Sequence, residues 1–526
     1  MRKEFERCTP EAVGIPSGAV MELLDTLEGG GFTQMHGLMI MRHGKVCAEG
    51  WWAPYAPQLH HALHSLSKTW TATAVGLAER EGLLSLDDHV CDILPERMPR
   101  PLTERARLVT VRDLLMMASG SEQEDAGYPK DWLERFFSLS MTHEPGKWWR
   151  YDTHGTAVLS AVVEKVSGLS MVDYLDTRLF GKIGIDGRHV MCRVGDDGTC
   201  LGGHGMFTTN EDDLRLMKLY LDGGVWEGER LLNERFVKDA TSPLQDTSPA
   251  HAHTPWIYDN CCGYGYQIWM CRPEGSYRAD GAYGQFCVVV PSLDLIVSIH
   301  EAGYLGEHMS HNELELLKGK IGADQPVHGP QATLNALFDI LLPQLSDEPL
   351  TPGKETKRLE ERLRRLAIPR PAASVTDRTE RPLDVELTAR DGGISFAIMY
   401  GMAKHNEDRP GAERIRLRCA DGRLTLVSTE AGTERTIVAD MRGGRATGKL
   451  VYTDHHEIVT DVACAAWWNA EDELELSVLW YETEDEDRFR FRFEGGRCEV
   501  TEWVETGVFG PRNEKRAVYT ARDNGR

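Results

Sequence analysis

The chain has 526 residues, of which 41% are hydrophobic and 27% charged, a composition typical of a folded protein with two or more domains. Its net charge of −23 argues against a nucleic acid or an anionic membrane as partner, because phosphate binding requires clustered Lys and Arg. No run of about 18 apolar residues occurs, so no transmembrane helix is expected. Met1 to Arg7 carry charges with no apolar stretch after them, which predicts no secretory signal and a cytoplasmic location.

The 12 cysteines are scattered from Cys8 to Cys498 without the spacing of a disulfide framework, so we expect free thiols in a reducing compartment. Cys261 and Cys262 are adjacent, an arrangement that seldom suits a redox or a metal site. Three histidine pairs suggest metal binding only superficially: His60 and His61, His251 and His253, and His455 and His456. No metal or other cofactor is expected.

The first half of the chain predicts a strand pair followed by helices. A helix within residues 10–35 begins at Pro16-Ser17, and strands at 36–41 and 45–51 flank a His-Gly turn. Further helices are expected from Ser65 to about residue 81, at 110–117, from about 156 to 166, and from 210 to 221 with Asn210 as its cap.

From residue 263 the pattern changes back to strands, at 264–270, 284–290 and 293–299, and helices near 311–321 and 331–345 are expected to cover them. Strands therefore occur early and late with helices between them. The fold class predicted is α+β, with both ends of this region in one antiparallel sheet and residues 60–220 forming a helical lobe. A site would lie in the cleft between sheet and helices.

A linker is predicted at residues 346–382, where prolines bracket a charged helix at 354–366. It separates a domain at 1–345 from a domain at 383–526. The latter shows about nine or ten short alternating segments, which predict an all-β barrel or sandwich. The segments include 384–387, 395–399, 414–418, 423–428, 448–453, 473–480 and 488–493.

The segment His64 to Trp70 contains the S-x-x-K pair Ser65 and Lys68, three residues apart and therefore on one face of a helix. A serine hydroxyl is a poor nucleophile until a base stands beside it, and an amine near a helix N-terminus can provide that base. This pair alone is a weak signal, since S-x-x-K arises often by chance.

Two further segments strengthen it. Pro145-Gly146 leads to Tyr151-Asp152-Thr153-His154-Gly155 and a helix, and Ala279-Asp280-Gly281-Ala282 runs through Gln285 into apolar strands. In this order, residues 10–325 resemble the superfamily of serine β-lactamases, penicillin-binding proteins and class C-related esterases. The resemblance implies a β-lactamase/transpeptidase-like fold and a serine hydrolase. Relatives with a lipocalin-like C-terminal barrel suggest the same for residues 383–526.

The resemblance also implies roles for individual residues. Ser65 matches the acylated nucleophile, and Lys68 matches the amine that shares in proton transfer. Tyr151 matches a tyrosine that acts with the lysine as general base and then protonates the leaving group; as a base it would need a cation, here Lys68, to lower its pKa. The backbone N–H groups of Ser65 and Ala282 match the oxyanion hole.

The predicted substrate-binding residues are Thr153, His204, Asp280, Gly281 and Gln285. Thr153 stands where the family has asparagine, and Gly281 is expected to let substrate approach the strand closely. His204 lies between glycines in a segment that approaches the site in this family, while a packed or solvated histidine is the alternative interpretation.

The main departure is at Ala279 and Asp280, because penicillin-recognising members have Lys-Thr-Gly or His-Thr-Gly there. A carboxylate facing the cleft would repel a substrate carboxylate, so we expect a neutral substrate or one that carries an amine. The ending Gly281 to Gln285 resembles esterases and amide hydrolases acting on short ω-amino-acid oligomers.

The predicted function is hydrolysis of an amide or ester of a small molecule or short peptide through an acyl-enzyme. The alternatives are a β-lactamase or D,D-peptidase, and a non-catalytic binding or scaffold protein on the same fold. The C-terminal β-domain is expected to cover the cleft rim, to support a homo-oligomer, or both.

Overall fold

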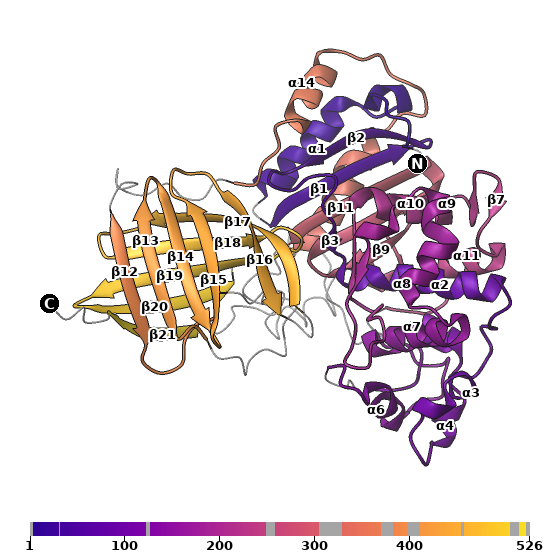
Figure 1. Cartoon of the computed structure of the whole chain (residues 1–526). Helices are drawn as coiled ribbons and strands as arrows, with labels where there is room; N and C mark the ends of the chain where they lie inside the picture. The colour runs from indigo at the N-terminus through magenta and orange to yellow at the C-terminus, as the bar shows by residue number, and fades with distance from the viewer. Residues whose placement is uncertain are drawn as a thin grey trace. The chain divides into compact units, whose positions relative to one another are not determined.

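The computed structural model describes residues 4–30, 32–122, 127–248, 258–303, 329–369, 382–396, 411–453, 457–504 and 515–521. The chain divides into two compact units, Met1–Leu366 and Ala367–Arg526 (Figure 1).

The first unit is built on an antiparallel sheet. Among the described residues it has six strands in the order β2-β1-β11-β10-β9-β8. Their bounds are β1 Thr33–Arg42, β2 Lys45–Trp51, β8 Trp269–Met270, β9 Tyr277–Gly281, β10 Gln285–Val290 and β11 Leu295–Gly303. Strand β1 pairs with β11, with Ile40 opposite Val297, which confirms that early and late segments share one sheet. Every residue of β10 and β11 is buried, as expected for central strands.

Helices cover both faces of this sheet. On one side lie α1 (Ser17–Gly29) and α14 (Lys354–Leu363), and on the other lie α10 (Asn210–Leu221), α2 (Ser67–Arg80) and α7 (Thr153–Ser167), as Figure 1 shows. Helix α1 also contacts η9 (Ala336–Leu341), which follows α13 (Gly329–Asn335), so the helical region expected at 331–345 is present.

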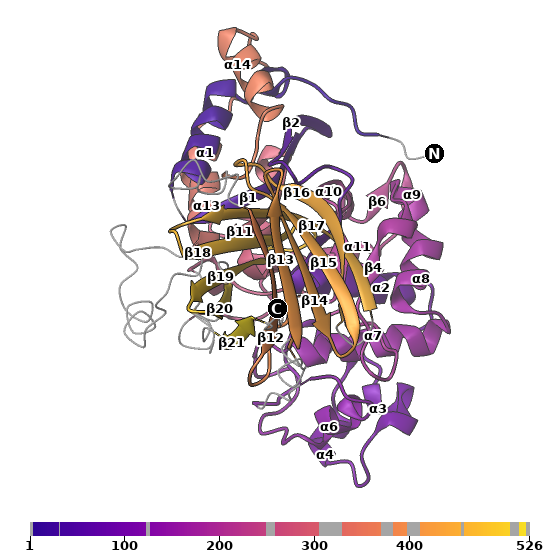
Figure 2. The same cartoon turned by 60° about the vertical axis from the view of Figure 1, so that its left-hand side comes forward.

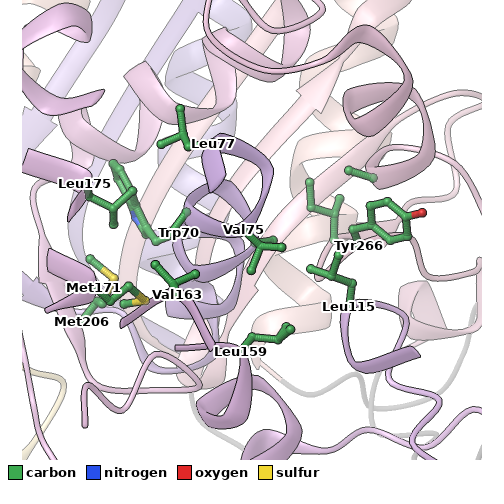
Figure 3. Packing of buried hydrophobic residues seen from close by; sticks show 14 of the residues in the cluster. Trp70, Val75, Leu77, Leu115, Leu159, Val163, Met171, Leu175, Met206 and Tyr266 are labelled. Atoms are coloured by element: carbon green, nitrogen blue, oxygen red, sulfur yellow. The ribbon is translucent and has the colours of Figure 1, made fainter. Parts of the chain in front are cut away.

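The α2–α7 pair forms the centre of the helical lobe. Ser67 to Ala78 of α2 are buried without interruption, as the apolar residues on most sides of this helix predicted. Figure 3 shows Trp70 and Val75 of α2 within the same apolar cluster as Leu159 and Val163 of α7. The other α-helices among the described residues of this unit are α3 Val90–Ile93, α4 Glu104–Arg107, α5 Val111–Leu115, α6 Trp132–Ser138, α8 Met171–Leu175, α9 Gly181–Ile183 and α11 Glu234–Ala240.

Small pairings complete the first unit. A short sheet joins β3 (His61–Ala62), β5 (Met206–Thr208) and β4 (Met191–Cys192), and β6 (Val225–Trp226) pairs with β7 (Glu229–Arg230). Because β3 immediately precedes the Ser65 segment, its pairing with β5 places the chain after residue 200 beside that segment.

Two local predictions differ from the structure, and a third is not tested by it. Thr209, not Asn210, caps α10, because its hydroxyl accepts from the Asp212 N–H in a capping box. Only Trp269 and Met270 of the strand expected at 264–270 are paired in β8; Gln267 has a φ of 59°, which bends the chain away from extended geometry. The helix expected at 311–321 lies outside the described residues.

The predicted linker is divided between the two units. Helix α14 belongs to the first unit, where Arg362 donates to Asp25 at 2.6 Å and to Glu28 at 2.5 Å. Helix α14 packs on α1 and β2, and its apolar face includes Leu359, which is 1% exposed. The unit boundary follows Leu366.

The second unit is a β-barrel. Its described part has ten strands in the order β15-β14-β13-β12-β21-β20-β19-β18-β17-β16, and an additional pairing between Asp440 of β15 and Ala465 of β17 closes a ring of nine (Figure 2). The bounds are β12 Leu383–Ala389, β13 Arg414–Ala420, β14 Arg423–Glu430, β15 Thr433–Asp440, β16 Ala446–Thr453, β17 Glu457–Trp468, β18 Glu473–Trp480, β19 Glu486–Glu494, β20 Arg497–Val504 and β21 Lys515–Ala521.

Alternating side chains fill the barrel. Leu417, Leu426 and Phe491 are buried, and Phe396 packs on Phe489 with ring centroids 4.8 Å apart. Ser395 and Phe396, expected to begin a strand at 395–399, are not in a strand, and residues 397–399 lie outside the described residues. The structure thus decides for a barrel over a sandwich.

Within the described ranges, no single helix has the length and apolar character needed to cross a membrane. The bent helix pair Thr153–Ser167 and Met171–Ile183 has enough length and apolar character when the two helices are taken together, by length and composition only.

Candidate active site

Ser65 lies in the 3₁₀ turn η2 (His64–Leu66), immediately before α2. It is partly exposed, whereas Leu66 and Ser67 after it are buried. His64 has a φ of 48° and Tyr283 a φ of 66°, left-handed conformations that are uncommon for residues other than glycine. The rings of His64 and Tyr283 lie 5.1 Å apart. Strained backbone of this kind clusters at functional sites, where the surrounding structure holds it.

Lys68 lies in the first turn of α2, is 1% exposed, and has three polar neighbours. Its Nζ donates to Ser65 Oγ at 3.0 Å, to Thr153 Oγ1 at 3.3 Å and to Gly203 O at 2.5 Å. Burial lowers the pKa of Lys68 from 10.5 to about 7, against the opposing effect of Asp152 and Asp280. A neutral amine keeps two N–H groups for Gly203 and Thr153 and turns its lone pair toward the Ser65 hydroxyl.

Tyr151 forms a hydrogen bond with the Ser65 side chain, and Lys68 Nζ lies 4.8 Å from the centre of its ring. Burial raises the pKa of Tyr151, and Asp280 raises it further. The expectation that a charged Lys68 lowers the pKa of this phenol is therefore wrong. Burial disfavours both charges, so near pH 7 the phenol is protonated and about half of the Lys68 amines are neutral.

Aromatic side chains surround Tyr151. Trp269 stacks on its ring with centroids 5.6 Å apart and an interplanar angle of 18°, and Tyr264 and Trp149 meet it edge-on or tilted. All three neighbours are at most 5% exposed. These rings fix the orientation of Tyr151, which is itself partly buried, and the burial raises the pKa of its phenol.

Thr153 begins α7, and Asp152 caps that helix by accepting from the Gly155 N–H at 3.1 Å. The cap places Thr153 Oγ1 within reach of Lys68. A threonine at this position therefore accepts from the lysine through its hydroxyl.

Asp280 on β9 forms an ion pair with Arg278, whose Nε donates to Asp280 Oδ2 at 2.7 Å. The guanidinium also donates to Met270 O at 3.0 Å and to Asn260 Oδ1, and it is fully buried. The charge of Asp280 is compensated, because Arg278 lies two residues away on the same strand face; the expected repulsion of a substrate carboxylate stays a prediction. Arg278 is in turn fully engaged, and Ala279 is 0% exposed.

Gly281 ends β9 against the Ser65 turn. A Cβ added there would lie 2.1 Å from Leu63 O and 3.2 Å from Leu66 N. In the structure the close approach at Gly281 is made by the backbone of the turn that carries Ser65, and the approach of a substrate there stays a prediction. It brings η2 against β9 and against η7 (Ala282–Gly284), which carries the partly exposed Ala282.

Gln285 and His204 lie near the site in different ways. Gln285 is fully buried, and its Nε2 donates to Ala282 O at 3.2 Å and to Glu301 O at 2.7 Å, so its amide braces the Ala282 turn. His204 packs on Tyr128 with ring centroids 5.4 Å apart, and burial lowers its pKa well below 6.5, so the ring is neutral. Its buried Nδ1 has no hydrogen-bond partner among the described residues.

Three residues that contribute to the site were not predicted from the sequence. The pairing of Arg278 with Asp280 could have been predicted from the sequence, because residues two apart on a strand share a face and pair readily. Gly203, whose carbonyl accepts from Lys68, and Trp269, which stacks on Tyr151, act across the fold and leave no local pattern.

Comparison with known proteins identifies the family. The model of the family described as Beta-lactamase matches residues 23–315, more than half of the chain. The chain belongs to this family. It is a hydrolase of the β-lactamase/transpeptidase-like fold with a C-terminal β-barrel. Across the described ranges, no group of three or more His, Cys, Asp or Glu side chains is placed to hold a metal ion.

Two relatives illustrate the range of the family. The chain is 27% identical over 280 residues to a 6-aminohexanoate-dimer hydrolase of Paenarthrobacter ureafaciens, covering 49% of this chain and 70% of that protein. It is 28% identical over 272 residues to penicillin-binding protein 4 of Amycolatopsis lactamdurans, covering 45% and 70%. Among solved structures, a family VIII carboxylesterase has a TM-score of 0.47 at 14% identity, covering 65% of this chain and 100% of that one.

Proposed function

We propose that the protein hydrolyses an amide or ester of a small molecule or short peptide through an acyl-enzyme on Ser65. The observation that supports this most is the position of Ser65 Oγ, 3.0 Å from the nitrogen of a buried lysine whose pKa falls to about 7. A serine beside an amine that is half neutral near pH 7 has the base that its hydroxyl requires.

In the acylation step, Ser65 Oγ bonds to the substrate carbonyl carbon while its proton passes to the Lys68 lone pair. The carbonyl oxygen becomes an oxyanion, which the N–H groups of Ser65 and Ala282 stabilise. The bond to the leaving group then breaks. Tyr151, protonated and hydrogen-bonded to Ser65, donates the proton that the leaving nitrogen or oxygen needs and recovers one from the Lys68 ammonium. Water repeats the sequence to release the acid.

Thr153 and Gly203 position the base in this scheme. Their oxygens accept hydrogen bonds from the two N–H groups of the neutral Lys68 amine. The lone pair of its nitrogen is thereby directed toward Ser65. Both are therefore positioning residues for Lys68.

A neutral substrate, or one carrying an amine, is favoured. At the position where penicillin-recognising members carry a cation this chain has buried Ala279, and the neighbouring Arg278 already pairs with Asp280 and donates to three other oxygen acceptors. Relatives named as a 6-aminohexanoate-dimer hydrolase and a lovastatin esterase are consistent with an uncharged scissile region.

A β-lactamase or D,D-peptidase is the second candidate, favoured by the similarity to penicillin-binding protein 4. Homo-oligomerisation and a role of the barrel at the cleft rim stay predictions, whereas relatives named as hydrolases argue against a silent scaffold on this fold.

Hydrolysis of a neutral p-nitrophenyl ester, an aminoacyl amide and a cephalosporin tests the proposal, with Ser65→Ala as the control. We expect turnover of the first two and none by the variant. Efficient cephalosporin turnover would instead assign the second candidate, and equal rates for the variant would remove Ser65 from the mechanism.

A further inference from the structure

A buried carboxyl group lies directly beneath the turn that carries Ala282. Gly284, the last residue of that turn, has a φ of 91°, and a Cβ added to it would lie 2.0 Å from Glu301 Oε1. The Glu301 side chain on β11 therefore occupies the space that a side chain at position 284 would need.

Gln285 connects the same turn to Glu301 through the backbone. Its Nε2 donates to both Ala282 O and Glu301 O, and the Glu301 N–H points to its Oε1 at 3.4 Å. The Gln285 amide thus holds the turn at Ala282, and the Glu301 side chain packs beneath Gly284.

The contacts of Glu301 accommodate a neutral acid. Thr333 Oγ1 of α13 lies 2.9 Å from each of the two carboxyl oxygens. A hydroxyl has one hydrogen, so both contacts are satisfied when one oxygen of Glu301 donates and the other accepts. Glu301 is fully buried, and burial raises its pKa to about 8.

The titratable groups of the surrounding elements do not neutralise Glu301. Tyr283 of η7 faces the His64 ring, and His300, next to Glu301 on β11, pairs with Asp213 at 3.0 Å. The described groups that act on the pKa of Glu301, besides burial, are the hydroxyls of Thr33 and Thr333.

We propose that Glu301, as a neutral carboxylic acid, is a positioning residue that holds the Ala282–Gly284 turn in the geometry that receives the oxyanion. Ionisation places an uncompensated charge under the turn. The charge can be relieved only by moving the turn toward solvent, which withdraws the Ala282 N–H from the developing oxyanion. This inference rests on the proposed function of Ser65 and adds an upper pH limit to it.

The test is the rate at which a neutral fluorophosphonate labels Ser65 between pH 6 and 9.5, followed by intact mass. The wild-type rate is expected to rise through pH 7 with Lys68 and to fall above about pH 8, approaching tenfold per pH unit. Glu301→Gln keeps the shape and the neutral charge, so the fall should disappear. Asp213→Asn is the matched control, because burial also raises the pKa of Asp213 to about 8, and it should keep the fall.

A second variant guards against misfolding of the first. Thr333→Val removes a hydrogen bond that lowers the pKa of Glu301, so it should move the alkaline midpoint to higher pH. A fall that persists in Glu301→Gln with an unmoved midpoint in Thr333→Val, or a wild-type rate that stays level to pH 9.5, overturns the inference and leaves the Ser65 mechanism standing. Absence of Ser65 labelling at every pH overturns both.

Discussion

Replacing Lys68 tests the state of the base. Lowering the pKa from 10.5 to about 7 corresponds to about 5 kcal/mol of lost preference for the charged form. At pH 7 about half of the Lys68 population is neutral, compared with less than about one part in 10³ for an ordinary lysine. Lys68→Arg keeps a cation that cannot lose its proton, and we expect it to lower kcat/KM by about 10³-fold or more.

The assay is ester hydrolysis from pH 5 to pH 9. Wild-type kcat/KM should rise about tenfold per pH unit up to a midpoint near pH 7, where Lys68 becomes neutral. Lys68→Met should abolish this limb together with the activity. Retention of wild-type kcat/KM within about tenfold by Lys68→Arg, or an acid limb that survives in Lys68→Met, would refute a neutral-lysine base.

Four other outcomes follow from the same contacts. The stability of the wild type relative to Lys68→Met should rise between pH 7 and about 10, because the unfolded chain holds the extra proton in that window; urea titrations measure it. Tyr151→Phe keeps the stack on Trp269 and should retain its melting temperature while losing about 10²–10⁴ in kcat; an active variant contradicts the proton-donor role. Gly281→Ala should lower both stability, by about 1–3 kcal/mol, and Ser65 labelling, since its Cβ meets Leu63 O. Asp280→Asn leaves Arg278 buried with a neutral partner and should cost about 3 kcal/mol in urea unfolding; an unchanged midpoint would show the ion pair to be dispensable.

Local sequence signals predicted the framework of the first unit well. The apolar runs of β10 and β11 and the bounds of α10 are visible in the sequence because burial on both strand faces and the helical period leave regular patterns. The cap of α10 was misplaced by one residue because Thr209 and Asn210 are both capping types; only the capping box with Asp212 distinguishes them.

The sequence predicted which residues form the site but not their protonation states. The motif order brought Ser65, Lys68 and Tyr151 together, and the structure places them in contact. Burial then decides the protonation of Lys68 and Tyr151, and burial depends on side chains such as Trp269 that are distant in sequence. The charge of Asp280 likewise depended on Arg278, a pairing that strand alternation alone would have suggested.

The most direct measurement is intact mass after rapid acid quench of the protein with a slowly deacylating ester, followed by peptide mapping. An acyl-enzyme mechanism predicts a mass increase equal to one acyl group, located on Ser65, absent from Ser65→Ala, and accumulating at the rate of the product burst. Product release without any acyl adduct, or an adduct of equal yield on Ser65→Ala, would contradict it.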